Sequence, residues 1–237
     1  MREVQSANYR LRLARGAQDL RAVQALRHLA FHGRPGIDAD RHDLYGEHLL
    51  VETLAGSALA TLRFRLFGEG AALDEAYSAR FYDLTAYGAQ AGAKAEIGRL
   101  CLHPEARDAE VLRLVWAGLA RVVTGADTLH LFGCSSLAGA EPGRHAAALA
   151  HLAATALGPP VLCPTPRGPA IPLGGPAPAD PAGLPPLLRF YLSLGGWVSD
   201  HAICDPQLGT TIVFTALDLS ALSAARARIL RQLAGAG

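Results

Sequence analysis

The sequence predicts a mixed α/β (α+β) fold, in which a central sheet carries helices on its faces. Two observations support this fold class. Strand and helix patterns are interleaved along the 237 residues in the order β-α-β-β-β-α-β-α-α-β-β. Half of the residues are apolar and 18% are charged, which is typical of a globular protein with a core of its own. No internal repeat or boundary divides the chain, so we expect a single domain over residues 1–237.

Alternation of apolar and polar residues predicts the strands, and apolar residues three and four apart predict the helices. In the first strand Tyr9, Leu11 and Leu13 alternate with Arg10 and Arg12. Strands are expected over residues 8–14, 48–54, 57–67, 95–107, 128–136, 197–203 and 210–217. Helices are expected over residues 17–31, 108–123, 143–157, 184–196 and, with a fraying end, 220–237; residues 32–47 are expected to form a polar loop.

One window of the chain has a different composition. Residues 158–186 hold 11 of the 15 prolines and five glycines. Because proline removes a backbone donor and fixes φ, we expect no regular structure there. The window lies between elements of one sheet, so we interpret it as an insertion into the domain rather than as a linker.

Composition and spacing exclude several classes of function. A net charge of +1 gives no general attraction for nucleic acid, and Lys94, the only lysine, leaves little room for a Schiff-base mechanism. The four cysteines and nine histidines are scattered without a metal-binding or disulfide spacing, so we expect free thiols and no metal. The first residues lack the apolar segment of a signal peptide, and residues 145–158 are too short to span a bilayer. We therefore expect a cytoplasmic protein.

The stretch AEIGRLCLHPEAR, residues 95–107, is the most informative part of the sequence. It is strand-like, yet it carries Glu96 and Arg99, and charged side chains are rarely buried unless they are paired or functional. Strict alternation would place these two on opposite faces. A bulge at Gly98 would return both to one cleft. The alternative is that Arg99 only compensates the charge of Glu96.

Other polar residues are candidates of the same kind. Arg63 lies in a strand and is either functional or part of a solvated sheet face. Arg27 and Phe31 lie one helical turn apart, and we expect Phe31 to pack rather than to bind. Ser135, with Ser136, is expected at a strand end, where its hydroxyl could reach a site.

The loop segment GIDADRHD places three carboxylates within six residues. Asp38, Asp40 and Asp43 could hold an amino group or a cation, or could simply be solvated. Calcium is disfavoured because the loop has neither the length nor the glutamate of an EF-hand.

An ordered series of segments over residues 8–217 resembles a known family. The segments are RHLAF, DADRHD followed by HLLV, ATLRFRL, YSARFYDL, AEIGRLCLHPEAR, LRLVWAGLA, LFGCSSLAG and LPPLLRFYLSLGGWV. The series resembles the bacterial ornithine–acyl-carrier-protein N-acyltransferases, once labelled hemolysin-like. These are similar in fold to acyl-homoserine-lactone synthases and to the GCN5-related N-acetyltransferases (GNAT). The resemblance implies a GNAT-like fold and transfer of a 3-hydroxyacyl chain from acyl carrier protein to the α-amino group of L-ornithine, giving lyso-ornithine lipid.

The resemblance also implies site residues. Arg27, Phe31, Asp40, Asp43, Arg63, Glu96 and Arg99 fall on positions that matter in the related lactone synthases. Glu96 is then the expected base for the amine, and Ser135 could assist at the thioester carbonyl. Arg63 or Arg99 could bind the substrate carboxylate. Asp40 and Asp43 could hold the δ-ammonium group or order their loop.

The chain departs from the acetyl-CoA users of this fold at residues 103–114, which lack the glycine-rich pyrophosphate loop. We therefore expect no free cofactor, with phosphopantetheine arriving on acyl carrier protein. Arg107, Arg113 and Arg121 could meet that acidic protein or be ordinary surface charges.

Two alternative functions remain at this point. One is an acyl-homoserine-lactone synthase-like enzyme that uses S-adenosylmethionine. The other is a non-catalytic, hemolysin-like protein that binds lipid or membrane. Because the implied product is amphiphilic, the resemblance also implies transient contact with the inner membrane.

Overall fold

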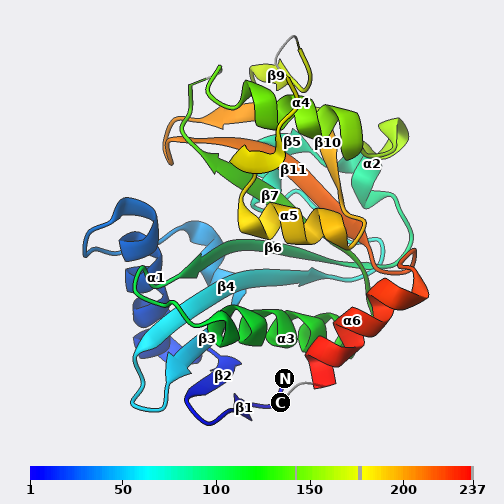
Figure 1. The fold of residues 1–237 in the computed structure, drawn as a ribbon. Coiled ribbons are helices and arrows are strands. Elements are labelled where there is room, and N and C mark those ends of the chain that lie inside the picture. Colours follow the sequence, from blue (N-terminus) through cyan, green and yellow to red (C-terminus); the bar gives the residue numbers. More distant parts are fainter. Residues whose placement is uncertain (142, 176–177, 236–237) are drawn as a thin grey trace. The chain divides into compact units, whose positions relative to one another are not determined.

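The computed structural model describes residues 1–141, 143–175 and 178–235 (Figure 1). The chain forms two compact units. The first contains Met1–Leu66, Ile97–Thr128 and the described residues from Ser223 onward. The second contains Phe67–Glu96 and the described part of 129–222. The expectation of a single domain stays a prediction.

The strands of the first unit follow one another in the order β1-β2-β3-β4-β6. Their bounds are β1 (Val4–Gln5), β2 (Tyr9–Leu13), β3 (Glu47–Thr53), β4 (Ala58–Phe67) and β6 (Ala93–Leu102), and the first residues of β6 belong to the second unit. The helices are α1 (Gly16–His32), the 3-10 turn η1 (Arg41–Leu44), α3 (Ala109–Gly125) and α6 (Ala224–Gly235). Strands β1 to β4 are antiparallel neighbours; short turns join β1 to β2 and β3 to β4, whereas the connection from β2 to β3 contains α1 and η1.

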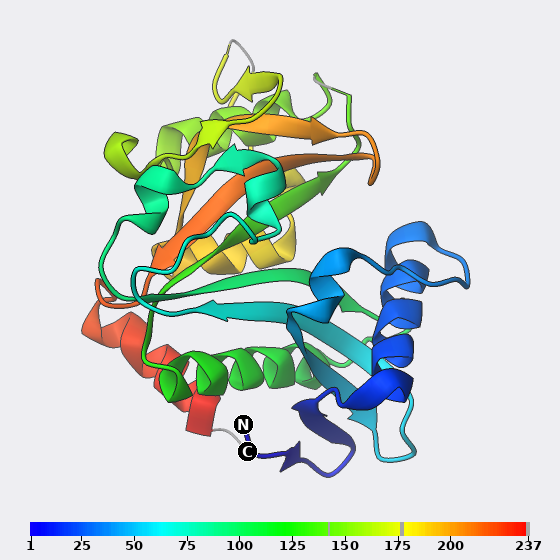
Figure 2. The ribbon, with the colours of Figure 1, turned by 180° about the vertical axis from the view of Figure 1, so that it is seen from behind.

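Helix α3 covers the apolar face of these strands (Figures 1 and 2). Leu11 pairs with Val51 and Leu49 with Leu62, so these side chains lie on one face. At Gly118 of α3, a Cβ atom would lie 3.1 Å from methyl groups of Leu11 and Leu49. The glycine therefore permits the close approach of the helix.

The opposite face of the same strands is polar. His48 pairs with Arg63 in the β3–β4 register, and neighbouring residues of each strand point to the α3 face. His48 is 4% exposed and Arg63 is 5% exposed. The interpretation of Arg63 as part of a solvated face was therefore wrong.

The second unit is built on the antiparallel strand order β7-β11-β10-β9. Their bounds are β7 (Thr128–Ala138), β11 (Thr210–Asp218), β10 (Trp197–Asp205) and β9 (Ala170–Pro172), with a separate pair β5 (Tyr82–Asp83) and β8 (Thr165–Pro166). The helices are α2 (Thr85–Gly88), α4 (Ala146–Thr155) and α5 (Pro186–Ser193), and the 3-10 turns are η2 (Ser78–Arg80), η3 (Pro160–Leu162) and η4 (Pro181–Gly183).

Two apolar clusters hold this unit together. Leu149 of α4 and Leu188 of α5 pack with Val198 and Val213 of the sheet. The second cluster joins apolar residues of the segment 67–87 to strands β7, β10 and β11, and Tyr82, Tyr87, Phe132 and Phe214 contribute aromatic rings to it. The rings of Tyr87 and Phe214 meet edge to face at 5.1 Å between centroids. The short segment between β4 and β6 is therefore part of the core.

Most predicted elements are confirmed with shifted ends, and two predictions were wrong. The strand expected over 95–107 ends at Leu102, before Pro104. The window 158–186 was expected to lack regular structure, yet it contains η3, β8, β9 and η4. Proline is tolerated in β9 because this strand lies at the end of the described strand order. It pairs with β10 on one side, and its other edge needs no backbone donors. Residues 176–177 of the window and 236–237 of the last predicted helix lie outside the described residues.

Outside the proline-rich window, five described elements were not predicted: β1, the turn η1 within 32–47, and η2, β5 and α2. Among the described residues, no helix combines the length and the apolar character needed to cross a membrane.

Candidate active site

Arg27 is the centre of a buried ionic cluster in the first unit. Helix α1 turns this side chain inward beside Val23 and Leu26, and Arg27 is 0% exposed. Its two terminal nitrogens each donate to one oxygen of Asp43 at 2.7 Å. Its Nε lies 3.0 Å from Asp38 Oδ2. A bidentate pair of this kind fixes the orientation of both the guanidinium plane and the carboxylate plane.

Asp40 and Asp43 order the loop in which they lie. Asp40 caps η1 by accepting from the His42 N–H at 2.8 Å, and its own N–H donates to Asp43 Oδ2 at 3.3 Å. Arg63 Nη1 reaches Asp40 Oδ1 at 2.6 Å and Asp43 Oδ1 at 2.8 Å. Of the two roles expected for these aspartates, the contacts support the ordering of the loop.

Arg99 completes the cluster from β6. Its guanidinium lies 2.9 Å from Asp40 Oδ2 and 3.3 Å from Asp38 Oδ2. We call this set of six side chains the Arg–Asp network. Its members are Arg27, Asp38, Asp40, Asp43, Arg63 and Arg99. Three guanidinium groups thus face three carboxylates.

The network sets the charge state of its members. Burial on its own would raise the pKa of Asp43, but the hydrogen bonds from Arg27 hold that pKa well below its usual range. The same balance of burial against Arg63 lowers the pKa of Asp40. His48 lies beside them, with Nε2 3.7 Å from Asp43 Oδ1. Burial lowers the pKa of His48 to about 4, so its ring is neutral at pH 7.

The bulge expected at Gly98 stays a prediction, but the backbone of β6 is unusual at the next residue. Arg99, and not Gly98, has a positive φ of 52°. A residue with a side chain rarely adopts this conformation, and it is most common at functional or tightly constrained positions. The guanidinium of Arg99 lies 5.9 Å from the ring centroid of Phe31. Phe31 is 43% exposed and does not belong to the buried core, and the expectation that it packs rather than binds stays a prediction.

Glu96 is a buried carboxylate of the second unit. It is 7% exposed, and its oxygens accept from the N–H of Tyr77, the N–H of Ser78 and the Ser78 hydroxyl, each at 2.7 Å. These three donors match an ionised carboxylate, which can only accept. Cys134 Sγ in turn lies 3.5 Å from Ser78 Oγ. Sequence reasoning missed Ser78, although it lies in one of the segments that carry the family resemblance.

Ser135 lies inside β7 and not at a strand end, so that prediction was wrong. It is opposite Val213 in the register with β11. The hydroxyl of Thr215 donates to Ser135 Oγ at 2.9 Å. Acting as an acceptor here leaves the Ser135 proton to be donated elsewhere.

The three arginines proposed for a carrier surface differ in their surroundings. Arg107 is exposed and precedes α3, Arg113 is exposed on α3, and Arg121 is half-buried. Arg113 lies 3.9 Å from Glu110 on the same helix. The N-terminus of α3 carries its own acidic cap, because Asp108 accepts from the Glu110 N–H at 2.8 Å.

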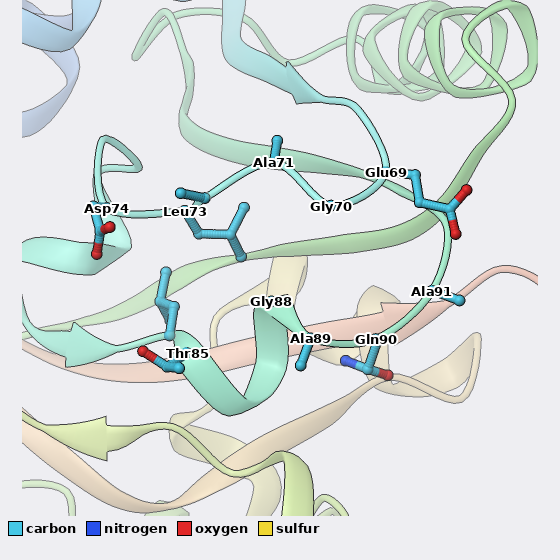
Figure 3. A pocket seen from close by; sticks show the side chains of 12 residues that line it. Glu69, Gly70, Ala71, Leu73, Asp74, Thr85, Gly88, Ala89, Gln90 and Ala91 are labelled. Carbon is cyan, nitrogen blue, oxygen red and sulfur yellow. The ribbon is translucent and has the colours of Figure 1, made fainter.

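A pocket of about 500 Å³ lies in the second unit, between the segments 69–74 and 84–91 (Figure 3). No predicted site residue is among those that line it. Lys94 fixes the adjoining backbone by donating to the carbonyls of Gln90 at 2.5 Å and Gly92 at 3.1 Å. This buried position gives the only lysine a structural role.

The predicted residues thus fall into two groups. The Arg–Asp network and Phe31 are brought together in the first unit, and Glu96 and Ser135 lie in the second. Convergence of Glu96 and Arg99 on one cleft stays a prediction.

Comparison with known proteins defines the class first. Residues 23–117 match the acetyltransferase (GNAT) domain family. The solved structure of TofI in an apo form has a similar fold, with a TM-score of 0.50 over 91% of this chain and 94% of that one, at 11% identity. The chain is an acyltransferase of the GNAT-like fold, with a mixed sheet and helices, as predicted.

The particular family follows from closer relatives. The L-ornithine N(alpha)-acyltransferase of Rhodobacter capsulatus is 30% identical over 91% of this chain and 92% of its own. The protein of the same name from Rhizobium meliloti is 30% identical over 92% of this chain and 82% of its own. The chain belongs to the L-ornithine N(alpha)-acyltransferase family, which confirms the resemblance and excludes a merely lipid-binding protein.

Proposed function

We propose that this chain transfers a 3-hydroxyacyl group from acyl carrier protein to the α-amino group of L-ornithine, giving lyso-ornithine lipid. The observation that carries the proposal is a 30% identity with an enzyme named for this acceptor, over about nine-tenths of both chains. The relatives favour ornithine over the alternative acceptor S-adenosylmethionine.

The chemistry needs a base and a site for developing negative charge. The α-ammonium group must lose a proton before its nitrogen can attack the thioester carbonyl. We assign that proton to Glu96, directly or through water. The new C–N bond then forms, the C–S bond breaks, and the thiol of phosphopantetheine leaves with a proton. Ser135 is the proposed donor to the carbonyl oxygen.

The donors around Glu96 make it a positioned base. Backbone and hydroxyl donors hold both of its oxygens, each at 2.7 Å, so its orientation is fixed before substrate arrives. Ser78 is the proposed positioning residue.

The aspartates of the Arg–Asp network are proposed to shape the acceptor site rather than to bind the ammonium groups of the substrate. Its carboxylates already face guanidinium groups, which weakens the idea that Asp40 or Asp43 holds the δ-ammonium. Arg63 and Arg99 remain the proposed partners of the substrate carboxylate, because a guanidinium has five donors and can serve several oxygens.

The donor is proposed to be a carrier protein and not free acyl-CoA. A helix N-terminus attracts phosphate through its N–H groups and dipole. In α3, Asp108 and Glu110 place carboxylates there instead. Arg107, Arg113 and Arg121 are the proposed contacts of the acidic carrier protein.

The acceptor is tested with purified protein and a 3-hydroxyacyl carrier protein, with ornithine or S-adenosylmethionine supplied in parallel. We expect N-acylornithine by mass spectrometry, together with release of the free carrier thiol. A homoserine lactone in place of that product would overturn the assignment. A third arm with the corresponding acyl-CoA should be slower.

The base is tested by Glu96→Gln against Glu105→Gln, an exposed glutamate of the segment before α3. We expect Glu96→Gln to lower kcat by about 10²–10⁴-fold and Glu105→Gln to leave it unchanged. Equal activity of the two variants would remove Glu96 from the mechanism. For the carrier surface, Arg113→Glu should raise KM for the carrier protein without changing kcat.

The amphiphilic product supports a further part of the proposal, which is peripheral contact with the cytoplasmic face of the inner membrane. Co-sedimentation with vesicles of anionic and of neutral phospholipid is the direct measurement. If the protein binds neither kind of vesicle, the proposed membrane contact is overturned, and the product must be released into the aqueous phase.

A further inference from the structure

Three side chains with metal-ligating atoms meet in the second unit, away from the residues discussed above. Cys163, Asp200 and His201 each offer one ligand atom, and these atoms all lie within 4.8 Å of one another. Asp200 Oδ1 lies 3.3 Å from Cys163 Sγ and 2.6 Å from His201 Nδ1. Cys163 comes from the proline-rich window, directly after η3, and the other two from β10.

A distortion of β10 makes this meeting possible. Adjacent strand residues normally point to opposite faces. In β10, however, the register with β11 shifts between Val198, which pairs with Thr215, and Ala202, which pairs with Val213. Three residues of β10 therefore face one residue of β11. Such a bulge re-aims side chains, and here it turns Asp200 and His201 toward the same thiol.

The bulge is itself fixed by buried hydrogen bonds. Ser199, which is 0% exposed, donates to the carbonyl of His201 at 2.7 Å and accepts from the Phe214 N–H at 3.2 Å. The His201 ring packs against Tyr82, with 5.5 Å between ring centroids. The histidine is thus held in place before any ligand arrives, which lowers the entropy cost of binding.

We propose that Cys163, Asp200 and His201 form a Zn²⁺ site that fastens the proline-rich window to β10. Thiolate, imidazole and carboxylate are the three ligand types that zinc takes in proteins, whereas calcium and magnesium prefer oxygen ligands alone. Tetrahedral zinc spaces such ligand atoms about 3.3–3.6 Å apart. The Asp200 side chain is 69% exposed and can move to that spacing.

The site has the form of three protein ligands with one position left for water. His201 is 8% exposed and forms the inner wall, while Asp200 lies at the surface. The nitrogen of His201 that faces the cluster is Nδ1, which lies 2.6 Å from Asp200 Oδ1, so a neutral imidazole would bind the ion through this atom.

This inference departs from the expectation of no metal, and it is independent of the proposed acyl transfer. Residue spacing does not indicate this cluster, because Cys163 lies 37 residues before Asp200 in the chain. A motif of that length has no recognisable spacing in a single sequence.

The test uses the full chain, freed of metal by chelation and kept reduced. Co²⁺ is titrated as a spectroscopic substitute for Zn²⁺, and Zn²⁺ is then added in competition. We expect one equivalent of cobalt, a thiolate-to-metal charge-transfer band, the strong visible bands of a four-coordinate ion, and loss of all of these when zinc is added. Thermal unfolding should shift to a higher temperature with zinc.

Variants locate the ion. Cys163→Ser should abolish the charge-transfer band, and Asp200→Asn should weaken cobalt binding by about tenfold or more. Because Asp200 is a surface residue, that variant is expected to fold. The controls are Cys204→Ser, whose thiol bonds to the Ala140 carbonyl at 2.9 Å, and Asp74→Asn, an 81% exposed carboxylate. Binding without the band, binding unchanged in Cys163→Ser and Asp200→Asn, or no binding at all would each overturn the proposal.

Discussion

Two buried carboxylates of this protein, Asp43 in the first unit and Glu96 in the second, are each 7% exposed but are held in different ways. Asp43 accepts from the guanidinium groups of Arg27 and Arg63 and from the Gln24 amide. Glu96 accepts from two backbone N–H groups and one hydroxyl in the turn at residues 77–78.

The difference shows that burial alone does not identify a catalytic carboxylate. Asp43 lies in a 3-10 turn and forms ion pairs with side chains from a helix and a strand. Its charge therefore serves to hold these three elements together. The donors of Glu96 orient the group and position a turn of backbone. We therefore expect changes at the first to act on stability, and changes at the second to act mainly on catalysis.

The strongest test of this comparison is Arg27→Met. Removal of the guanidinium leaves the three carboxylates of the network facing only Arg63 and Arg99, so one buried negative charge loses its compensation. We expect unfolding in urea to lose about 3–5 kcal/mol. The exposed Arg113→Met should change stability by less than about 0.5 kcal/mol. A comparable small change for Arg27→Met would mean that water screens the network, and the contrast with Glu96 would disappear.

The next test uses pH, because His48 lies against Asp43. The folded pKa of His48 is lowered to about 4 by burial, while the unfolded chain takes up the proton near 6.5. The unfolded state therefore binds more protons between these values, and folding stability should fall by up to about 3 kcal/mol as pH drops from 6.5 to 4.

His48→Gln should flatten this part of the stability profile, whereas exposed His32→Gln should leave it unchanged. The lowered pKa values of Asp40 and Asp43 add their own loss of stability from about pH 5 downward, where the carboxyls of the unfolded chain begin to take up protons, so the two proteins are compared between pH 6.5 and about 5. An identical slope with and without His48 would place proton uptake elsewhere.

The sequence could predict the elements and part of the site for a physical reason. Alternation and helical spacing record which face of an element is buried, so β2, β4 and α3 were recognisable. Charges inside a strand pattern are costly unless they are used, so Glu96 and Arg99 were recognisable too.

The remaining features depend on contacts between distant segments. Ser78 lies in a segment without periodicity, and only its meeting with Glu96 gives it a role. His48 lies in an apolar strand, where nothing local indicates its neighbour Asp43. The exposure of Phe31 depends on where the end of α1 meets its surroundings, and helical spacing does not record that. The positive φ of Arg99 falls on a residue type that rarely adopts it.

Ser78→Ala sharpens the comparison at Glu96. The variant removes one of the three described donors and keeps the two backbone N–H groups, so we expect a loss of about 1–2 kcal/mol in urea unfolding. Because the carboxylate loses orientation, kcat should fall more than KM changes. Exposed Ser57→Ala is the control. A loss of stability with unchanged kcat would give Ser78 and Glu96 the purely structural role seen at Asp43.

The smallest expected effect lies at the edge of the Arg–Asp network. Phe31 is 43% exposed and presents its ring to the guanidinium of Arg99. Phe31→Leu keeps apolar bulk but removes the aromatic face, so unfolding should lose only about 0.5–1 kcal/mol. If Arg99 binds the substrate carboxylate, loss of this packing should raise KM for ornithine and leave KM for the acyl donor unchanged. If neither KM rises, Arg99 has only a structural role, in which its partners are Asp38 and Asp40.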